Sequence, residues 1–209
     1  MGIFFLEKIE QLLKKFENIE GFSQWVVDAK NPKNFEDFFF ELLVLENLFK
    51  KTDKFILKPE NEISGSVLEA SLEKQGIFSY IECTKLDSIP LNVLNKVNSL
   101  FNKSTQKFRG KQGIHFLGVF NFFEYPNGIE KQNPKLNYMI EIIKKMFRRG
   151  KGSRVLAFVI TNIFVAYNPK LDNSFVQKRF LIVPNPSKFN KEFNSFFDSI
   201  FDVDEIQNY

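Results

Sequence analysis

The chain has 209 residues, a formal net charge of +4 and a mean hydropathy of −0.21, values that exclude a disordered chain and fit one globular α/β domain over residues 1–209. No stretch approaches the roughly 20 apolar residues of a membrane-spanning helix, so no membrane partner is expected. One cysteine and one histidine exclude a disulfide framework and a Cys/His zinc cluster, and they favour a reducing, cytoplasmic location in which any metal is held by oxygen.

In chain order, apolar residues at helical spacing predict an N-terminal helix over 3–17 and a mostly buried helix over 34–51. A short strand over 54–59 follows, and Pro59 ends it. Strict alternation predicts a strand over 67–73, and the returning strand runs over 77–84. If Gln75 and Gly76 form a two-residue hairpin loop, Glu69 lies directly opposite Glu82.

The remaining pattern predicts a helix from Pro90 to about 108, a strand over 113–123 and a helix over 135–147. Two apolar strands (154–161 and 163–168), a strand (177–183) and a last helix (188–201) complete the chain. This order predicts a mixed central β-sheet flanked by α-helices. The C-terminal strands and helix (135–201) either extend the sheet or form the surface of a homodimer.

Three carboxylates stand in surroundings that do not suit them. Glu41 lies on an apolar helical stripe with Phe38, Leu45 and Leu48, where a buried ion needs a partner. Glu69 and Glu82 share one face of the hairpin, where opposed like charges repel. A divalent cation between them would reverse that penalty, and Mg²⁺ is the natural candidate because it binds one or two carboxylates and leaves positions for water and phosphate.

These residues resemble the core of the PD-(D/E)XK restriction-endonuclease-like superfamily over about residues 34–122. The resemblance rests on the helix FFELLVLENL with Glu41, on Glu69 twelve residues before the segment IECTK, and on a helix ending in STQKF before the strand GIHFLGVF. It implies a restriction-endonuclease-like α/β fold and metal-dependent hydrolysis of phosphodiester bonds in DNA.

Carried over residue by residue, the resemblance implies that Glu69 and Glu82 hold Mg²⁺ or Mn²⁺ and that Lys85 assists the attacking water. It further implies that Glu41 completes the site and that Gln106 points into it, with Lys107 as a further contact. The chain departs from the pattern at two steps. No Pro-Asp precedes the hairpin, since position 66 is Ser, and Thr84 occupies the usual lysine position two residues after the glutamate. In a regular strand Lys85 points away from Glu82, so it serves only if the strand bulges, ends there, or lets the side chain curl back.

Several polar residues of this region also have an ordinary structural interpretation. The glutamates of the hairpin also fit an ordinary solvated sheet face. Cys83 alternates toward the apolar face and is predicted to be a small core residue. His115, between Ile114 and Phe116 on an apolar strand, is predicted to be a hydrogen-bonded structural histidine.

Two basic groups are candidates for contact with a nucleic-acid backbone. Lys103, Lys107, Arg109 and Lys111 lie where a strand bound at the site would pass. A second group, which comprises Arg148, Arg149 and Lys151, fits phosphate binding or the cationic end of a helix with a glycine cap. The sequence therefore carries two hypotheses: a Mg²⁺-dependent DNA endonuclease, and a catalytically inactive relative of the same fold that binds nucleic acid or a protein.

Overall fold

The computed structural model describes residues 2–29, 35–86, 89–119, 123–124, 131–132, 134–168, 173–188 and 190–201. The helices are α1 (Gly2–Phe16), α2 (Phe22–Ala29), α3 (Phe35–Phe49), α4 (Val93–Lys107), α5 (Pro134–Arg148) and α6 (Lys191–Ile200). The strands are β1 (Lys54–Leu57), β2 (Glu60–Asn61), β3 (Ser66–Val67), β4 (Ala70–Lys74), β5 (Ile77–Leu86), β6 (Gly113–Val119), β7 (Phe123–Glu124), β8 (Lys131–Gln132), β9 (Val155–Asn168) and β10 (Asn173–Pro184).

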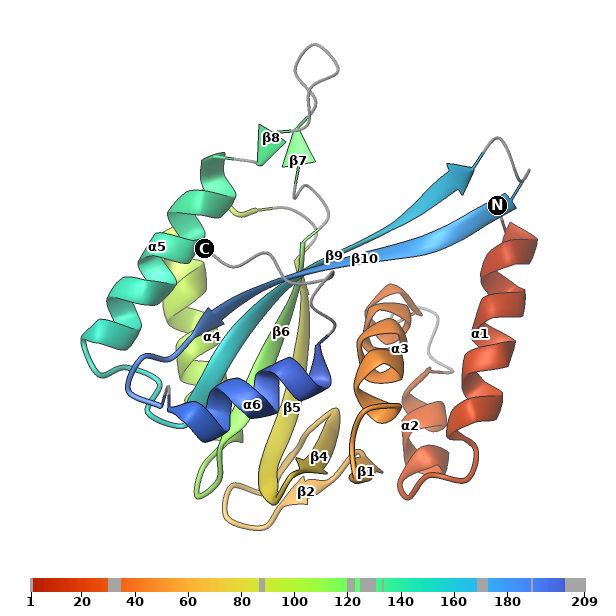
Figure 1. The fold of residues 1–209 in the computed structure, drawn as a ribbon, viewed down its shortest axis with the longest axis horizontal. Helices are drawn as coiled ribbons and strands as arrows, with labels where there is room; N and C mark the ends of the chain where they lie inside the picture. Colours follow the sequence, from red (N-terminus) through yellow and green to blue (C-terminus); the bar gives the residue numbers. More distant parts are fainter. Residues whose placement is uncertain are drawn as a thin grey trace.

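A mixed six-stranded sheet forms the centre of the molecule, with strand order β1-β4-β5-β6-β9-β10 (Figure 1). The inner strands β5, β6 and β9 run parallel, whereas β1, β4 and β10 pair with their neighbours in antiparallel fashion. Parallel neighbours need long crossovers, and α4 and α5 lie in the two crossovers here.

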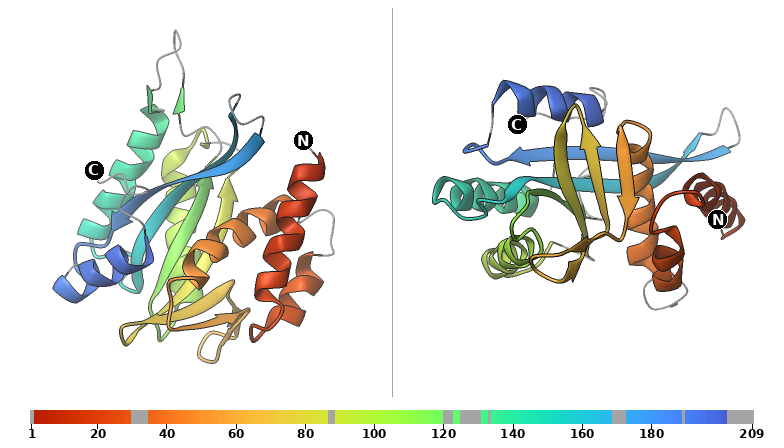
Figure 2. Two further views of the ribbon diagram at one scale, coloured as in Figure 1. Left: turned by 45° about the vertical axis from the view of Figure 1, so that its right-hand side comes forward. Right: turned by 90° about the horizontal axis from the view of Figure 1, so that it is seen from below.

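Two hydrophobic clusters cover the two faces of this sheet, so the fold has three layers (Figure 2). On one face, residues of α3 and α6 pack on Ile81, Cys83 and Phe116, and α1 and α2 lie outside α3. On the other face, residues of α4 and α5 pack on Tyr80, Leu117 and Phe158. Alternation along β5 thus sends odd-numbered side chains toward α3 and even-numbered ones toward α4.

The central hairpin has the predicted register. Ser71 pairs with Tyr80 and Ala70 with Ile81, and the loop residues Gln75 and Gly76 have φ angles of 53° and 76°. Positive φ at both positions is the signature of a type I′ turn, whose twist matches that of the flanking strands. Cys83 is buried in the core, as predicted from its parity in the strand.

Several observed elements differ from those predicted from the sequence. The helix α2 lies between the two predicted helices 3–17 and 34–51, where no element was predicted, and the predicted strand over 67–73 is divided into β3 and β4. The two apolar segments after position 154 form the single strand β9. β6 covers 113–119 of the strand predicted over 113–123, and residues 120–122 of that prediction lie outside the described residues. Beyond Thr161, where β6 ends its pairing, β9 and β10 continue as a two-stranded ribbon past α3 (Figure 1).

Candidate active site

The site lies where the central sheet meets the residues just before β4. Glu82 of β5 pairs with His115 of β6, and the side chain of Glu82 lies on the face that α4 covers. The registered pairs of β1 and β4 end at Leu57 and Ala70, so Lys58 and Glu69 lie just beyond them. The amide of Glu69 donates to the carbonyl of Ile81, and the carbonyl of Glu69 accepts from the amide of Lys58.

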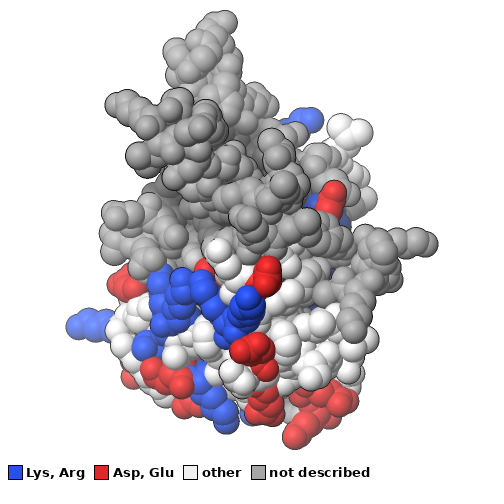
Figure 3. Space-filling model, turned by 90° about the vertical axis from the view of Figure 1, so that its right-hand side faces the viewer, with Lys and Arg blue, Asp and Glu red and all other residues white. Residues whose placement is uncertain are grey.

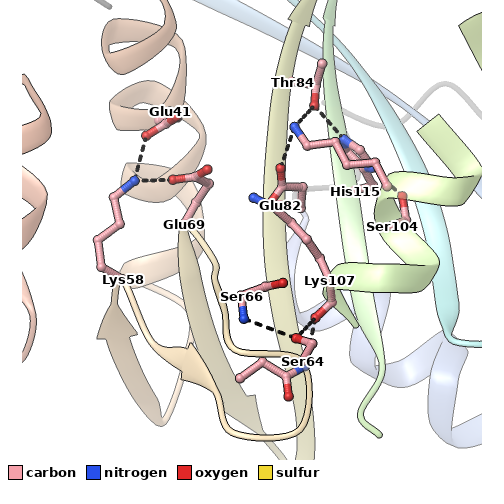
Figure 4. A network of polar contacts seen from close by, with 12 residues as sticks. Glu41, Lys58, Ser64, Ser66, Glu69, Glu82, Thr84, Ser104, Lys107 and His115 are labelled. Carbon is pink, nitrogen blue, oxygen red and sulfur yellow. Dashed lines mark hydrogen bonds and ion pairs between the residues drawn. The ribbon is translucent and has the colours of Figure 1, made fainter. Parts of the chain in front are cut away.

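The first half of the site joins α3 to the edge of the sheet through Lys58 (Figure 4). The ammonium of Lys58 donates a hydrogen bond to Oε2 of Glu69 and lies 3.8 Å from Oε2 of Glu41. All three side chains are largely buried, with exposed fractions of 10%, 11% and 16% for Lys58, Glu69 and Glu41. Lys58 has a φ of 46°, in the left-handed region that a lysine rarely adopts, so local backbone strain accompanies its placement.

Crowding of the carboxylates changes the protonation of Glu41. Burial, then repulsion from Glu69, raises the pKa of Glu41 to about 8, although Lys58 opposes this shift. A hydrogen bond to Glu69 and the charge of Glu82 act in the same direction. The charges of Glu69 and Glu82 thus both favour the protonated form of Glu41.

The second half of the site is a fully buried glutamate held by two lysines. Glu82 has no exposed side-chain surface, and its Oε1 lies 2.8 Å from Nζ of Lys103 while its Oε2 lies 2.6 Å from Nζ of Lys107. Burial and the nearby Glu69 raise the pKa of Glu82, whereas the two lysines lower it. The interpretation of Glu69 and Glu82 as a solvated sheet face is therefore wrong, because both are buried.

The positions of these lysines follow from α4 and its C-terminal end. Lys103 and Lys107 are four residues apart, so they lie on one side of the helix. The β2–β3 hairpin holds that end of α4, because the buried Asn61 donates hydrogen bonds of 2.7 Å and 3.0 Å to the carbonyl oxygens of Lys107 and Arg109. Ser64 adds a longer contact of 3.4 Å to the same carbonyl of Lys107.

A buried hydrogen-bond chain lies next to Glu82 (Figure 4). Oγ1 of Thr84 lies 2.8 Å from Nε2 of His115, and Oγ of Ser104 lies 2.6 Å from its Nδ1. Lys103 donates to Oγ1 of Thr84 at 3.2 Å. Burial lowers the pKa of His115 well below 6.5, and the charges of Lys103, Lys107 and Lys96 act in the same direction. His115 is a hydrogen-bonded, buried residue, as predicted.

The structure does not bring Lys85 to the other candidate residues. Its ammonium forms an ion pair with Glu36 at the start of α3. β5 remains regular through Leu86, and no shift of its register to β6 occurs at Lys85, so the side chain follows the parity of Cys83 and points to the opposite face from Glu82. The bulge or curled side chain that a role for Lys85 requires is absent from this described strand.

The other α4 residues are more exposed. Gln106 is exposed, and its neighbours Lys103 and Lys107 are the α4 side chains that reach Glu82. Arg109 and Lys111 are exposed just after the helix, and Nζ of Lys111 lies 5.6 Å from the ring centre of Phe78. These two residues form a basic continuation of the site along the surface.

The second basic group belongs to a helix end. Arg148, Arg149 and Lys151 are exposed at the C-terminus of α5. Gly150 has a φ of 74°, and the amides of Gly150 and Lys151 bond to the carbonyls of Phe147 and Met146. This pattern is a Schellman cap. It favours the structural interpretation of the group, and among the described contacts none links it to Glu82.

The face that carries α1 is electrostatically mixed. In its described part, basic and acidic side chains intermingle (Figure 3). Lys14 pairs with Glu10 at 2.9 Å and Lys15 with Glu46 at 3.0 Å. These contacts neutralise cations in pairs, so this face offers a nucleic acid less than the α4 end does.

Sequence reasoning gave Lys58 no role, and it did not connect Thr84, Ser104 and His115. A register for the strand over 54–59 would have found Lys58, since it stands beside Glu69. The four-residue spacing of Lys103 and Lys107 was visible in the sequence, but only the fold shows that this side of α4 faces Glu82.

Within the described ranges, no group of three or more His, Cys, Asp or Glu side chains is arranged so that it could hold a metal ion. No helix in the same ranges is long and apolar enough to cross a membrane.

Comparisons with known proteins leave the family open. No protein-family model and no curated protein matches the sequence. The solved structure of SfsA from Pyrococcus furiosus in complex with Ca²⁺ is similar with a TM-score of 0.33 and 13% sequence identity, over 70% of this chain and 62% of that chain. The chain thus spans less than two thirds of the SfsA chain, and similarity at this level assigns neither a fold family nor an activity.

Proposed function

We propose that the chain has a restriction-endonuclease-like fold and is a Mg²⁺-dependent nuclease that hydrolyses phosphodiester bonds in DNA. The observation that carries the proposal is that three largely buried glutamates, Glu41, Glu69 and Glu82, are held by lysine ammonium groups, Lys58 at the first two and Lys103 and Lys107 at the third. The element order α3-β1-β4-β5-α4-β6, with the glutamates on α3, before β4 and on β5, supports the same proposal.

The chemistry of the donor atoms supports a hard divalent cation. All three acidic groups offer carboxylate oxygens, the ligands that Mg²⁺ prefers. The ammonium of Lys58 lies between two of the carboxylates, which supports positive charge at this position. Glu69 and Glu82 would hold Mg²⁺ or Mn²⁺, with Glu41 beside them. When bound, the ion supplies Lewis-acid polarisation of a phosphoryl oxygen and a more acidic water.

The protein's own cations have distinct parts in the proposal. Lys103 and Lys107 lie at the buried glutamate, where ammonium groups stabilise charge that develops on phosphoryl oxygens. The exposed Arg109 and Lys111 continue this charge along the surface, where they contact the backbone of the substrate on either side. This arrangement binds a phosphodiester without selecting a base.

One observation favours a second function, a catalytically inactive member of this fold that binds nucleic acid. Lys85 is paired with Glu36 on the opposite face, and Thr84 at the usual lysine position is engaged by His115. No lysine of β5 is therefore available to assist an attacking water, and the nuclease proposal relies on the lysines of α4 instead.

The test is cleavage of supercoiled plasmid and short oligonucleotides in Mg²⁺, in Mn²⁺ and in EDTA. Wild type is compared with Glu82→Gln and with Glu73→Gln, a matched control on β4. The proposal expects metal-dependent cleavage that Glu82→Gln removes and Glu73→Gln retains. Cleavage that persists in EDTA, or equal cleavage by Glu82→Gln and Glu73→Gln, contradicts the proposal. Salt-sensitive binding without cleavage supports the inactive alternative.

A further inference from the structure

Thr84 connects the buried histidine to a lysine of the candidate site. Its hydroxyl lies 2.8 Å from Nε2 of His115 and accepts a hydrogen bond from Lys103 at 3.2 Å. Lys103 in turn lies 2.8 Å from Oε1 of Glu82. A continuous chain of polar contacts thus runs from the interior of the α4 layer to the buried carboxylate.

The contacts of Ser104 determine where the ring proton is. Oγ of Ser104 lies 2.7 Å from the carbonyl oxygen of Leu100, which can only accept, so the single hydroxyl hydrogen is donated there. The 2.6 Å contact between Oγ and Nδ1 of His115 therefore needs its hydrogen from the ring. His115 carries its hydrogen on Nδ1, and in the neutral ring Nε2 is an acceptor.

This tautomer fixes the direction of the next two bonds. Nε2 accepts from the hydroxyl of Thr84, so the lone pairs of that oxygen are available to Lys103. The ring has no exposed surface, and its surroundings include Lys103 and Lys107, so a positively charged ring is strongly disfavoured. The direction of every bond in the chain is then determined by the carbonyl group of Leu100.

We propose that His115 and Ser104 are positioning residues that orient the Thr84 hydroxyl, which holds the Lys103 ammonium at Glu82 beside the reacting phosphodiester. Thr84 thus secures a lysine from the neighbouring helix in place of one on its own strand. The catalytic consequence rests on the proposed function, whereas the tautomer and the restraint on Lys103 do not depend on it.

The tautomer is measured by nitrogen-15 NMR of the imidazole. His115 is the only histidine, so the ring signals need no assignment by mutation. The proposal expects a hydrogen on Nδ1 and an unprotonated Nε2 in the wild type. Ser104→Ala removes the acceptor for Nδ1 and is expected to shift the ring toward the Nε2–H form. A wild-type ring with its hydrogen on Nε2 overturns the proposal.

The restraint on Lys103 is measured by its rate of acetylation, relative to the exposed Lys111, with peptide mass spectrometry. Thr84→Val removes the hydroxyl at nearly constant volume and is expected to raise this ratio about threefold, while Thr84→Ser keeps it near the wild-type value. Thermal unfolding of both variants confirms that each is folded. An unchanged ratio in folded Thr84→Val overturns the restraint.

Cleavage kinetics give the catalytic test. Thr84→Val is expected to lower kcat roughly tenfold with little change in KM, and Thr84→Ser to restore it to within about twofold. Wild-type kcat in Thr84→Val overturns the positioning role. If the wild type cleaves no substrate but the ring carries Nδ1–H and Thr84→Val raises the Lys103 ratio, the proposed function fails and the positioning of Lys103 is supported.

Discussion

Nζ of Lys107 lies 2.6 Å from Oε2 of Glu82, a carboxylate with no exposed surface. A buried carboxylate needs compensating charge, and here α4 supplies it from Lys107 and, at the other oxygen, from Lys103. These are the cations that the proposal assigns to the substrate. A buried acid is thus paired with two partly exposed lysines.

The lysine that matters for activity is expected to be on α4. Lys103→Met keeps the aliphatic stem but removes the charge at Glu82, and we expect kcat to fall roughly tenfold to a hundredfold. Lys85→Met is the matched control, since Lys85 pairs with Glu36 on the other face, and its activity is expected to stay within about threefold of wild type. Steady-state cleavage rates measure both. A larger loss in Lys85→Met than in Lys103→Met contradicts the assignment.

Lys58 is expected to be essential for stability without metal. Lys58→Met leaves Glu41 and Glu69 buried without the ammonium between them. Removing one partner of a buried ion pair costs about 3–5 kcal/mol of unfolding free energy. Urea unfolding in EDTA measures this loss. We further expect Mg²⁺ to stabilise Lys58→Met more than wild type, and equal stabilisation of the two proteins would argue against a cation site there.

Glu41 is expected to make the fold less stable as pH rises. Its folded-state pKa is about 8 against an ordinary value of 4.5, so the folded protein holds a proton that the unfolded chain has released between these values. The stabilising contribution of this proton is complete below pH 4.5 and is lost as pH rises through 8. Glu41→Gln mimics the protonated form, and its Tm is expected to exceed that of wild type by about 5 °C at pH 8.

The control for Glu41→Gln is the same comparison near pH 5. There wild-type Glu41 is protonated in the folded state, so the difference in Tm should be small. Thermal unfolding in EDTA at several pH values between 5 and 8 measures how the difference in Tm between Glu41→Gln and wild type changes with pH. A difference that stays constant or shrinks as pH rises would show that Glu41 is ionised in the fold.

Asn61 is expected to hold the β2–β3 hairpin against α4. Asn61→Ala removes two hydrogen bonds from a fully buried amide to the carbonyls of Lys107 and Arg109. The expected loss is about 1–3 kcal/mol, measured by urea unfolding. Ser64→Ala removes a longer contact to the same helix end and should cost less. Equal losses of unfolding free energy in Asn61→Ala and Ser64→Ala would mean that the two hydrogen bonds of Asn61 do not hold the β2–β3 hairpin to α4.

Much of the sheet could be predicted because its determinants are local. Alternation before the Gln75-Gly76 turn predicts the hairpin, and the turn specifies the register that pairs Ser71 with Tyr80. The apolar surroundings of Glu41 also identified it as unusual, and it is largely buried. These features required no knowledge of how distant segments pack.

The lysines could not be placed from the sequence because their positions depend on long-range packing. Lys58 reaches the site only because β1 pairs with β4, and Lys103 reaches Glu82 only because α4 covers that face. The displaced Lys85 was the visible candidate, and strand parity turns it toward Glu36. Thr84, at the usual lysine position, gains a partner from β6 that no local pattern indicates.

The most direct test of the account is whether Glu69 and Glu82 together bind one divalent ion. Binding of Mn²⁺ to the full chain is followed by electron paramagnetic resonance, with Mg²⁺ as competitor, in wild type, Glu69→Gln, Glu82→Gln and the control Glu73→Gln. The account predicts one Mn²⁺ that Mg²⁺ displaces in wild type and Glu73→Gln, and at least about a tenfold weaker affinity in the other two variants. Equal Mn²⁺ affinity in all four proteins would contradict it.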